Sequence, residues 1–127
     1  MRPRCHTADS FRVGPSTIPG AGLGLFARVP IGLEETIGYY TGEVITLEEL
    51  EQGRYAGSSY LLWVTSRHIV VGEGPKANYT RYINHSEEPN AFLIVSTRWK
   101  TARLEAVREI APGEEIFFHY GEEFPLS

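Results

Sequence analysis

A bent, polar segment at 81–90 reads RYINHSEEPN and gathers an arginine, two asparagines, a histidine and a serine. Pro89 fixes a turn there, so that side-chain amides, an imidazole and several backbone groups can face one ligand. This set suits a polar small molecule. A metal ion is the other interpretation, with His85 and Glu87 or Glu88 as ligands. No second histidine or cysteine lies at ligand spacing, and we therefore expect no metal site.

A glycine-rich loop at 19–26 reads PGAGLGLF and leads into an apolar stretch. Glycines let the backbone approach a ligand closely, because no Cβ intervenes. The loop does not fit a dinucleotide-binding fingerprint, which has a strand before it and a helix after it. No Gly-Lys-Ser/Thr follows, so it is not a phosphate-binding loop either. Taken alone, it is better explained as a tight turn.

The third candidate is the segment EIFFHY at 115–120. As a strand, it would place Phe118 and Tyr120 on one face, and Phe117 and His119 on the other. An aromatic face that ends in a phenol suits core packing, or it lines a narrow channel for an alkyl chain that carries a cation. For this segment alone, core packing is the simpler interpretation.

The elements that position these segments are short, because thirteen glycines and eight prolines divide the chain of 127 residues. Stretches rich in aromatic and β-branched residues predict strands at 11–13, 23–27, 36–45, 60–65, 68–73, 91–97, 102–109 and 115–120. Thr46 and Glu49 fit a capping box and predict a helix that ends near Gly53. A weaker signal predicts a helical turn at 78–84. The fold class is mainly β (a β-rich α+β domain), with one or two small helices.

Length and composition limit the function classes further. A chain of 14.2 kDa with 42% hydrophobic residues is expected to form a single domain, 1–127, rather than a disordered chain. The sequence contains no apolar run of membrane-spanning length, and its first residues lack the apolar stretch of a signal peptide. The single cysteine, Cys5, excludes an internal disulfide and a multi-cysteine zinc cluster. We therefore expect a soluble, intracellular protein.

The net charge of −4 lies in the C-terminal third of the chain. Residues 1–83 carry eight basic and eight acidic side chains, whereas residues 84–127 carry four basic and eight acidic ones. A phosphate backbone would be repelled by the second part, so a nucleic acid partner is not expected. A basic peptide would be attracted to it. A solvated acidic surface without a partner remains the simpler interpretation of charge alone.

The order of the motifs along residues 11–124 resembles the SET-domain protein lysine methyltransferases. The matching elements are Gly-x-Gly, then Tyr-x-Gly-Glu at 40–43, then Arg-Tyr-Ile-Asn-His-Ser-x-x-Pro-Asn, then Gly-Glu-Glu-Ile-x-Phe-x-Tyr-Gly. The third and fourth elements are specific and the others are supporting. In length the chain is similar to minimal viral and microbial SET proteins, without zinc-binding flanking segments.

The resemblance implies a SET fold with a C-terminal pseudoknot, S-adenosylmethionine as the cofactor, and a lysine that enters from the opposite face through a channel. Tyr120 would be the catalytic tyrosine and Tyr60 the second tyrosine, at the channel mouth, with Phe118 also lining the channel. The implied cofactor-binding residues are Gly22, Leu23, Gly24, Arg81, Asn84, His85 and Phe124. No metal is implied.

Two positions bear on the product and on the partner. Phe118 stands where family members carry Phe or Tyr, and the phenylalanine implies di- or trimethylation. His119 replaces the usual aspartate, and we expect activity to survive this change. The implied substrate is a lysine in a basic tail such as a histone's, which would place the protein in a nucleus or host nucleus. Compact relatives dimerise, so a homodimer is expected.

Two alternatives remain open at this point. One is a catalytically silent SET-like module that binds a peptide or S-adenosylmethionine. The other is an unrelated small β-domain that acts as a protein-interaction module.

Overall fold

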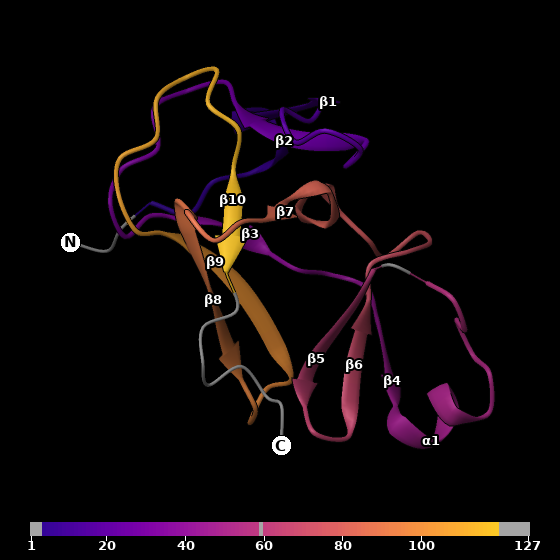
Figure 1. Ribbon diagram of the computed structural model, residues 1–127. Helices are drawn as coiled ribbons and strands as arrows, with labels where there is room; N and C mark the ends of the chain where they lie inside the picture. Colours follow the sequence, from indigo (N-terminus) through magenta and orange to yellow (C-terminus); the bar gives the residue numbers. More distant parts are fainter. Residues whose placement is uncertain (1–3, 59, 120–127) are drawn as a thin grey trace.

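The computed structural model describes residues 4–58 and 60–119 (Figure 1). The described part is rich in short strands, with one short α-helix and two 3-10 turns, in agreement with the expected fold class. In chain order the elements are η1 (Ala8–Ser10), β1 (Phe11–Pro15), β2 (Leu23–Ala27), β3 (Thr36–Tyr39), β4 (Glu43–Thr46), α1 (Leu47–Glu51), β5 (Leu61–Thr65), β6 (His68–Val71), η2 (Tyr79–Tyr82), β7 (Asn84–His85), β8 (Ala91–Ser96), β9 (Thr101–Ala106) and β10 (Phe117–His119).

The strands of the described residues form three separate sheets. β1 and β2 make an antiparallel pair, and β4, β6 and β5 make a three-stranded sheet that lies beside α1 at the far end of the molecule (Figure 1). The largest sheet has the order β3-β9-β8-β10-β7. Its antiparallel β8–β9 pair is the hairpin that the sequence predicts across 91–109.

The last described strand is threaded between two strands that are close in sequence. β10 pairs in parallel with both β7 and β8, which are joined by the loop 86–90. The loop holds the strand, since Ser86 N donates to Phe118 O at 3.0 Å and Asn90 N donates to Phe117 O at 3.1 Å. The threaded C-terminal segment that the resemblance implies is thus confirmed as far as residue 119.

Two apolar clusters stabilise these sheets. The larger one contains residues of all three sheets, including the fully buried Leu25 of β2, Ile37 of β3 and Val64 of β5. The smaller one lies under the three-stranded sheet and is built on Ile45, Ile69 and Val71. Burial of apolar area on this scale is the main favourable contribution to folding.

Local expectations are confirmed in most places and wrong in one. The capping box is present, with Glu49 N donating to Thr46 Oγ1 at 3.1 Å and Thr46 N donating to Glu49 Oε1 at 3.0 Å. The stretch 36–45, predicted as one strand, is two strands in different sheets. The break is at Gly42, where a Cβ would collide with the carbonyl group of Val71. Among the described residues, no helix is long and apolar enough to cross a bilayer.

Candidate functional site

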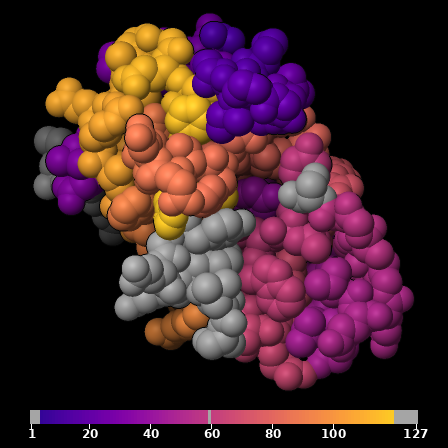
Figure 2. Space-filling view, viewed as in Figure 1, coloured from indigo at the N-terminus to yellow at the C-terminus, as the bar shows by residue number. Residues whose placement is uncertain are grey.

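A pocket of about 510 Å³ lies where the glycine-rich loop, the segment around 81–85 and the strands β5 and β10 converge. Figure 2 shows the surface hollowed between the segment around 81–85 and the three-stranded sheet. The volume lies within the range of small-molecule sites. The pocket is lined by Ala21, Gly22, Leu23, Tyr40, Tyr60, Leu61, Leu62, Thr80, Arg81, Tyr82, Ile83, Asn84, His85, Leu93, Leu104 and Phe118.

The segment that leads into the glycine-rich loop is anchored by hydrogen bonds to one buried carboxylate. Glu115, which is 6% exposed, accepts hydrogen bonds from Ser16 Oγ at 2.7 Å, from Thr17 N at 2.7 Å and from Thr17 Oγ1 at 2.6 Å. Burial alone would raise the pKa of Glu115, but the donors of Ser16 and Thr17 hold that pKa below its usual value. An ionised carboxylate therefore fixes the start of the loop that leads to the pocket.

Glycine is needed at two positions of the loop, 22 and 24, for different structural reasons. Gly22 lines the pocket and has a φ of 77°, a backbone conformation that residues other than glycine rarely adopt. Gly24 lies on β2 and is not among the lining residues. A Cβ at Gly24 would collide with the carboxylate of Glu115. The structure therefore places Gly24 behind the pocket wall, against the group that anchors the loop.

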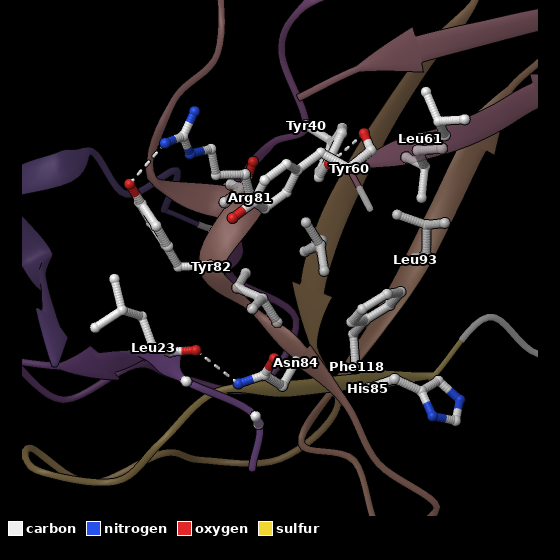
Figure 3. Close-up of a pocket in the computed structure, with 16 residues that line it drawn as sticks. Leu23, Tyr40, Tyr60, Leu61, Arg81, Tyr82, Asn84, His85, Leu93 and Phe118 are labelled. Carbon is white, nitrogen blue, oxygen red and sulfur yellow. Dashed lines mark hydrogen bonds between the residues drawn. The ribbon is translucent and has the colours of Figure 1, made fainter. Parts of the chain in front are cut away.

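Asn84 connects the polar segment to the glycine-rich loop. Its Nδ2 donates to Leu23 O at 3.0 Å (Figure 3) and lies 3.3 Å from Glu115 Oε2. One amide group thus contacts both the first residue of β2, which follows the loop, and the carboxylate that anchors the loop. The sequence indicated Asn84 as a ligand-binding residue. The geometry adds that Asn84 also positions Leu23, which lines the pocket from the glycine-rich loop.

Arg81 lies between two aromatic rings. Its Cζ is 5.1 Å from the ring centre of Tyr60 and 4.9 Å from that of Tyr82, and its Nη2 donates to Tyr82 Oη at 2.9 Å (Figure 3). Its Nη1 also donates to Gly72 O at 3.3 Å. These contacts hold a positive charge at the pocket wall, where it can bind an anionic group such as a carboxylate.

Tyr60 is positioned by its backbone as well as by Arg81. Tyr40 Oη donates to Tyr60 O at 2.8 Å, and Gly72 N donates to the same carbonyl oxygen at 2.9 Å. Phe118 enters the pocket from β10, on the other side of the cavity from the three-stranded sheet (Figure 3). Phe118 on β10 and Tyr60, which directly precedes β5, therefore contribute aromatic surface to the lining beside aliphatic side chains such as Leu61.

A family model described as the SET domain matches residues 22–121. The chain belongs to the SET-domain family. It is 32% identical to histone-lysine N-methyltransferase EZH2 of Chaetomium thermophilum, over 93% of this chain and 8% of that protein. It is 36% identical to histone-lysine N-methyltransferase MEDEA of Arabidopsis thaliana, over 91% of this chain and 17% of that protein. The chain thus spans a small part of the length of either relative.

A solved structure with the same fold is described as ctPRC2 in an autoinhibited conformation bound to S-adenosylmethionine. It matches with a TM-score of 0.74 at 30% identity, over 91% of this chain and 16% of that chain. A second, a humanized mutant of the Chaetomium thermophilum Polycomb Repressive Complex 2 bound to the inhibitor GSK343, matches with a TM-score of 0.72 at 30% identity, over 91% of this chain and 15% of that chain.

Most of the site residues that the SET resemblance implies meet at the pocket. Those that line it are Gly22, Leu23, Tyr60, Arg81, Asn84, His85 and Phe118. The ring of His85 is exposed, and its centre lies 5.9 Å from that of Phe118 in an edge-to-face contact at the border of the pocket (Figure 3). Two further predicted residues of this SET domain, Tyr120 and Phe124, lie outside the described residues.

Sequence reasoning gave no role to Tyr40, which lines the pocket, or to Glu115, which anchors the loop that leads to it. Tyr40 stood in a quoted motif, but nothing in its neighbours indicated that its hydroxyl would reach Tyr60. Glu115 stood in the Gly-Glu-Glu-Ile motif and in a predicted strand, and neither gave it a role of its own. Its partners Ser16 and Thr17 lie at the other end of the chain, so no local pattern could have found the contact.

Proposed function

We propose that this SET domain transfers a methyl group from S-adenosylmethionine to a lysine side chain of a protein. The observation that carries the proposal is the pocket, where Gly22, Asn84 and Phe118 come together from distant parts of the chain. Relatives named histone-lysine N-methyltransferases support the reaction class. A structural relative described as bound to S-adenosylmethionine supports the choice of cofactor.

The residues present fit such a cofactor. The cavity of about 510 Å³ has the size expected for a ligand of this class. Arg81 offers a cation for a carboxylate, Asn84 offers an amide, and Gly22 offers a backbone without a Cβ at the cavity wall. When bound, S-adenosylmethionine supplies an electrophilic methyl group on a cationic sulfonium. Phe124, which the resemblance assigns to the adenine, belongs to the same proposal.

The lysine channel is proposed to run along the aromatic part of the lining. Tyr60, Phe118 and Leu93 present apolar surface that accepts the aliphatic stem of a lysine and excludes water from it. The incoming amine must be neutral to react, although its ordinary pKa is about 10.4. A site with little water favours the neutral amine. The hydroxyl group of Tyr120 is proposed to orient that amine, and the lost proton leaves to water.

We further propose that the substrate is a basic tail such as a histone's and that the product is di- or trimethylated. The excess of acidic residues in 84–127 supports attraction of a basic peptide. Phe118 in place of a tyrosine supports the higher methylation states, because it leaves space beside the amine. A histone substrate would place the protein in a nucleus or host nucleus.

The first experiment combines cofactor binding with methyl transfer. Calorimetry with S-adenosylmethionine measures binding, and labelled S-adenosylmethionine is then supplied with core histones or with a mixed lysate. We expect label in a protein band, loss of nearly all transfer in Tyr120→Phe, and little change in its cofactor affinity. Tyr55→Phe is the matched control, since the Tyr55 hydroxyl group donates to Glu43 and lies outside the pocket lining.

The outcomes separate the proposals. Label in histones supports the full proposal, and label confined to other lysate proteins keeps the reaction and overturns the histone substrate. Cofactor binding without transfer to any protein overturns the enzyme and favours the catalytically silent module. No binding and no transfer would favour an interaction domain of another kind.

The homodimer expected from the resemblance is also a proposal. Phe92 and Ile94 on β8 are 48% and 37% exposed, which suits a contact with a second copy of the chain. Light scattering at several protein concentrations tests it, and a monomeric mass at all of them would rule it out.

A further inference from the structure

Two histidines and a glutamate meet on the surface beside the threaded strand. His85 ends β7 and His119 ends β10, and these two strands are parallel neighbours in the largest sheet. The ring centres of His85 and His119 are 4.9 Å apart, and His119 Nε2 lies 3.4 Å from Glu87 Oε2. Potential ligand atoms of all three side chains lie within 4.8 Å of one another.

The fold brings a second histidine, His119, to His85, although the two are far apart in sequence. Within the segment 81–90, His85 had only Glu87 and Glu88 as nearby donors, which is too few for a site. Insertion of β10 between β7 and β8 brings His119 to the same place. Sequence spacing indicated no metal, and this juxtaposition is the reason to depart from that expectation.

We propose that His85, Glu87 and His119 bind one divalent transition metal ion, with Zn²⁺ as the ion that fits best. Imidazole nitrogen and carboxylate oxygen are both ordinary zinc ligands, and three protein ligands leave a fourth position for water. Mg²⁺ and Ca²⁺ prefer sites made of oxygen ligands, so two imidazoles disfavour them.

The geometry requires only a small adjustment of the side chains. Ligands about 2.0–2.2 Å from a tetrahedral ion lie roughly 3.5 Å from each other. Glu87 is 84% exposed at its side chain, and His85 is also exposed. Rotation of the exposed Glu87 side chain can therefore bring its carboxylate toward the imidazoles of His85 and His119, whose ring centres already lie 4.9 Å apart.

Binding at this place would link β10 to the loop that crosses it. The described pairing of β10 with β7 consists of two residue pairs, Phe117 with Asn84 and Phe118 with His85. An ion held by residues from both sides would fasten this short pairing. Because Asn84 and Phe118 also line the pocket, the ion would stabilise the same region that the methyltransferase proposal uses. The metal site itself does not depend on that proposal.

The test is a zinc titration of the full chain without a histidine tag. We expect calorimetry to give one ion per chain, and excess ZnCl₂ to raise the melting temperature by roughly 5 °C or more. His119→Gln and Glu87→Gln should each weaken binding at least ~10-fold, in line with the loss of one ligand. Their metal-free melting curves establish that they fold. MgCl₂ should give no comparable shift.

His68→Gln is the matched control. His68 is a histidine of the three-stranded sheet whose Nδ1 lies 2.9 Å from Thr65 Oγ1, far from the cluster in the fold. It should bind zinc as the unaltered protein does. Zinc-edge X-ray absorption, which needs no variant, should detect scattering from two imidazole rings. Absence of zinc binding, equal binding by His119→Gln, or an absorption spectrum without imidazole scattering would each overturn the proposal, leaving a surface ion pair between Glu87 and His119.

Discussion

Asn90 and Phe117 are joined by two hydrogen bonds that fasten the threaded strand. Phe117 N donates to Asn90 Oδ1 at 2.8 Å, and Asn90 N donates to Phe117 O at 3.1 Å. Asn90 Nδ2 also donates to Glu115 O at 2.9 Å, and the residue is only 1% exposed. A single buried asparagine therefore satisfies backbone groups on both sides of Ile116, at the point where the last strand passes under the loop 86–90.

Replacement of Asn90 by alanine should destabilise the whole domain. The change leaves the N–H group of Phe117 and the carbonyl group of Glu115 buried without their partner, at a cost of about 2–4 kcal/mol in the free energy of unfolding. Urea denaturation measures this difference. Glu88→Gln, an exposed change in the same loop, should stay within about 0.5 kcal/mol of the unaltered protein. A loss of less than about 1 kcal/mol in Asn90→Ala would contradict the role assigned to Asn90.

Glu115→Gln should weaken both the fold and the binding of S-adenosylmethionine. Glutamine keeps the volume, but its NH₂ group replaces one of two accepting oxygens. The NH₂ group cannot accept, so either the donors of Ser16 and Asn84 or those of Thr17 lose their partner. We expect a loss of about 1–3 kcal/mol in unfolding free energy and a roughly 3- to 10-fold rise in the dissociation constant, because the loop before Gly22 loses its anchor. Calorimetry and urea denaturation measure the two effects.

The control for Glu115 is Glu109→Gln, which removes one exposed carboxylate of the same charge. This variant should bind S-adenosylmethionine with unchanged affinity. If both variants weaken binding equally, net charge rather than the anchoring contact would explain the effect.

The stabilisation by Glu115 should disappear in acid. Burial raises the pKa of this group, but the hydrogen bonds from Ser16 and Thr17 outweigh it and lower the folded-state pKa below the ordinary value of 4.5. The contribution of the carboxylate is therefore fully present above about pH 4.5, and it is lost as the pH falls through the lower, folded-state value. The difference in unfolding free energy between the unaltered protein and Glu115→Gln should be constant from pH 8 to about 5 and should shrink below that. A difference that persists unchanged at pH 3 would mean that the charge does not matter.

Local patterns predicted most of the elements because the interactions that form them are local. The capping box at Thr46 and Glu49 lies within four residues, and the start and end of β2 follow from its flanking turns. The split of 36–45 into β3 and β4 was not predictable in this way, because it depends on Gly42 packing against the backbone of Val71 in another strand.

The site was predictable to the extent that it consists of motifs. Arg81, Asn84 and His85 share one segment, and that segment does line the pocket. The supporting contacts join segments that are distant in sequence, such as Glu115 with Thr17 and Tyr40 with Tyr60. Hydrogen bonds of this kind depend on how distant segments meet in the fold, which leaves no periodic signal in the chain.

Phe118→Tyr should change the product without abolishing the reaction. Phe118 lines the pocket from β10 and packs against the main apolar cluster. A phenol in its place adds a hydroxyl group that can hold a water molecule in the space that a second or third methyl group would need. We expect the variant to stall at an earlier methylation state, with monomethyl-lysine enriched several-fold in mass spectra of the same substrate.

The control is Phe92→Tyr, an exposed aromatic position on β8 outside the pocket lining, which should leave the product distribution unchanged. Spectra of Phe118→Tyr still dominated by trimethyl-lysine would contradict the proposal that position 118 sets the methylation state.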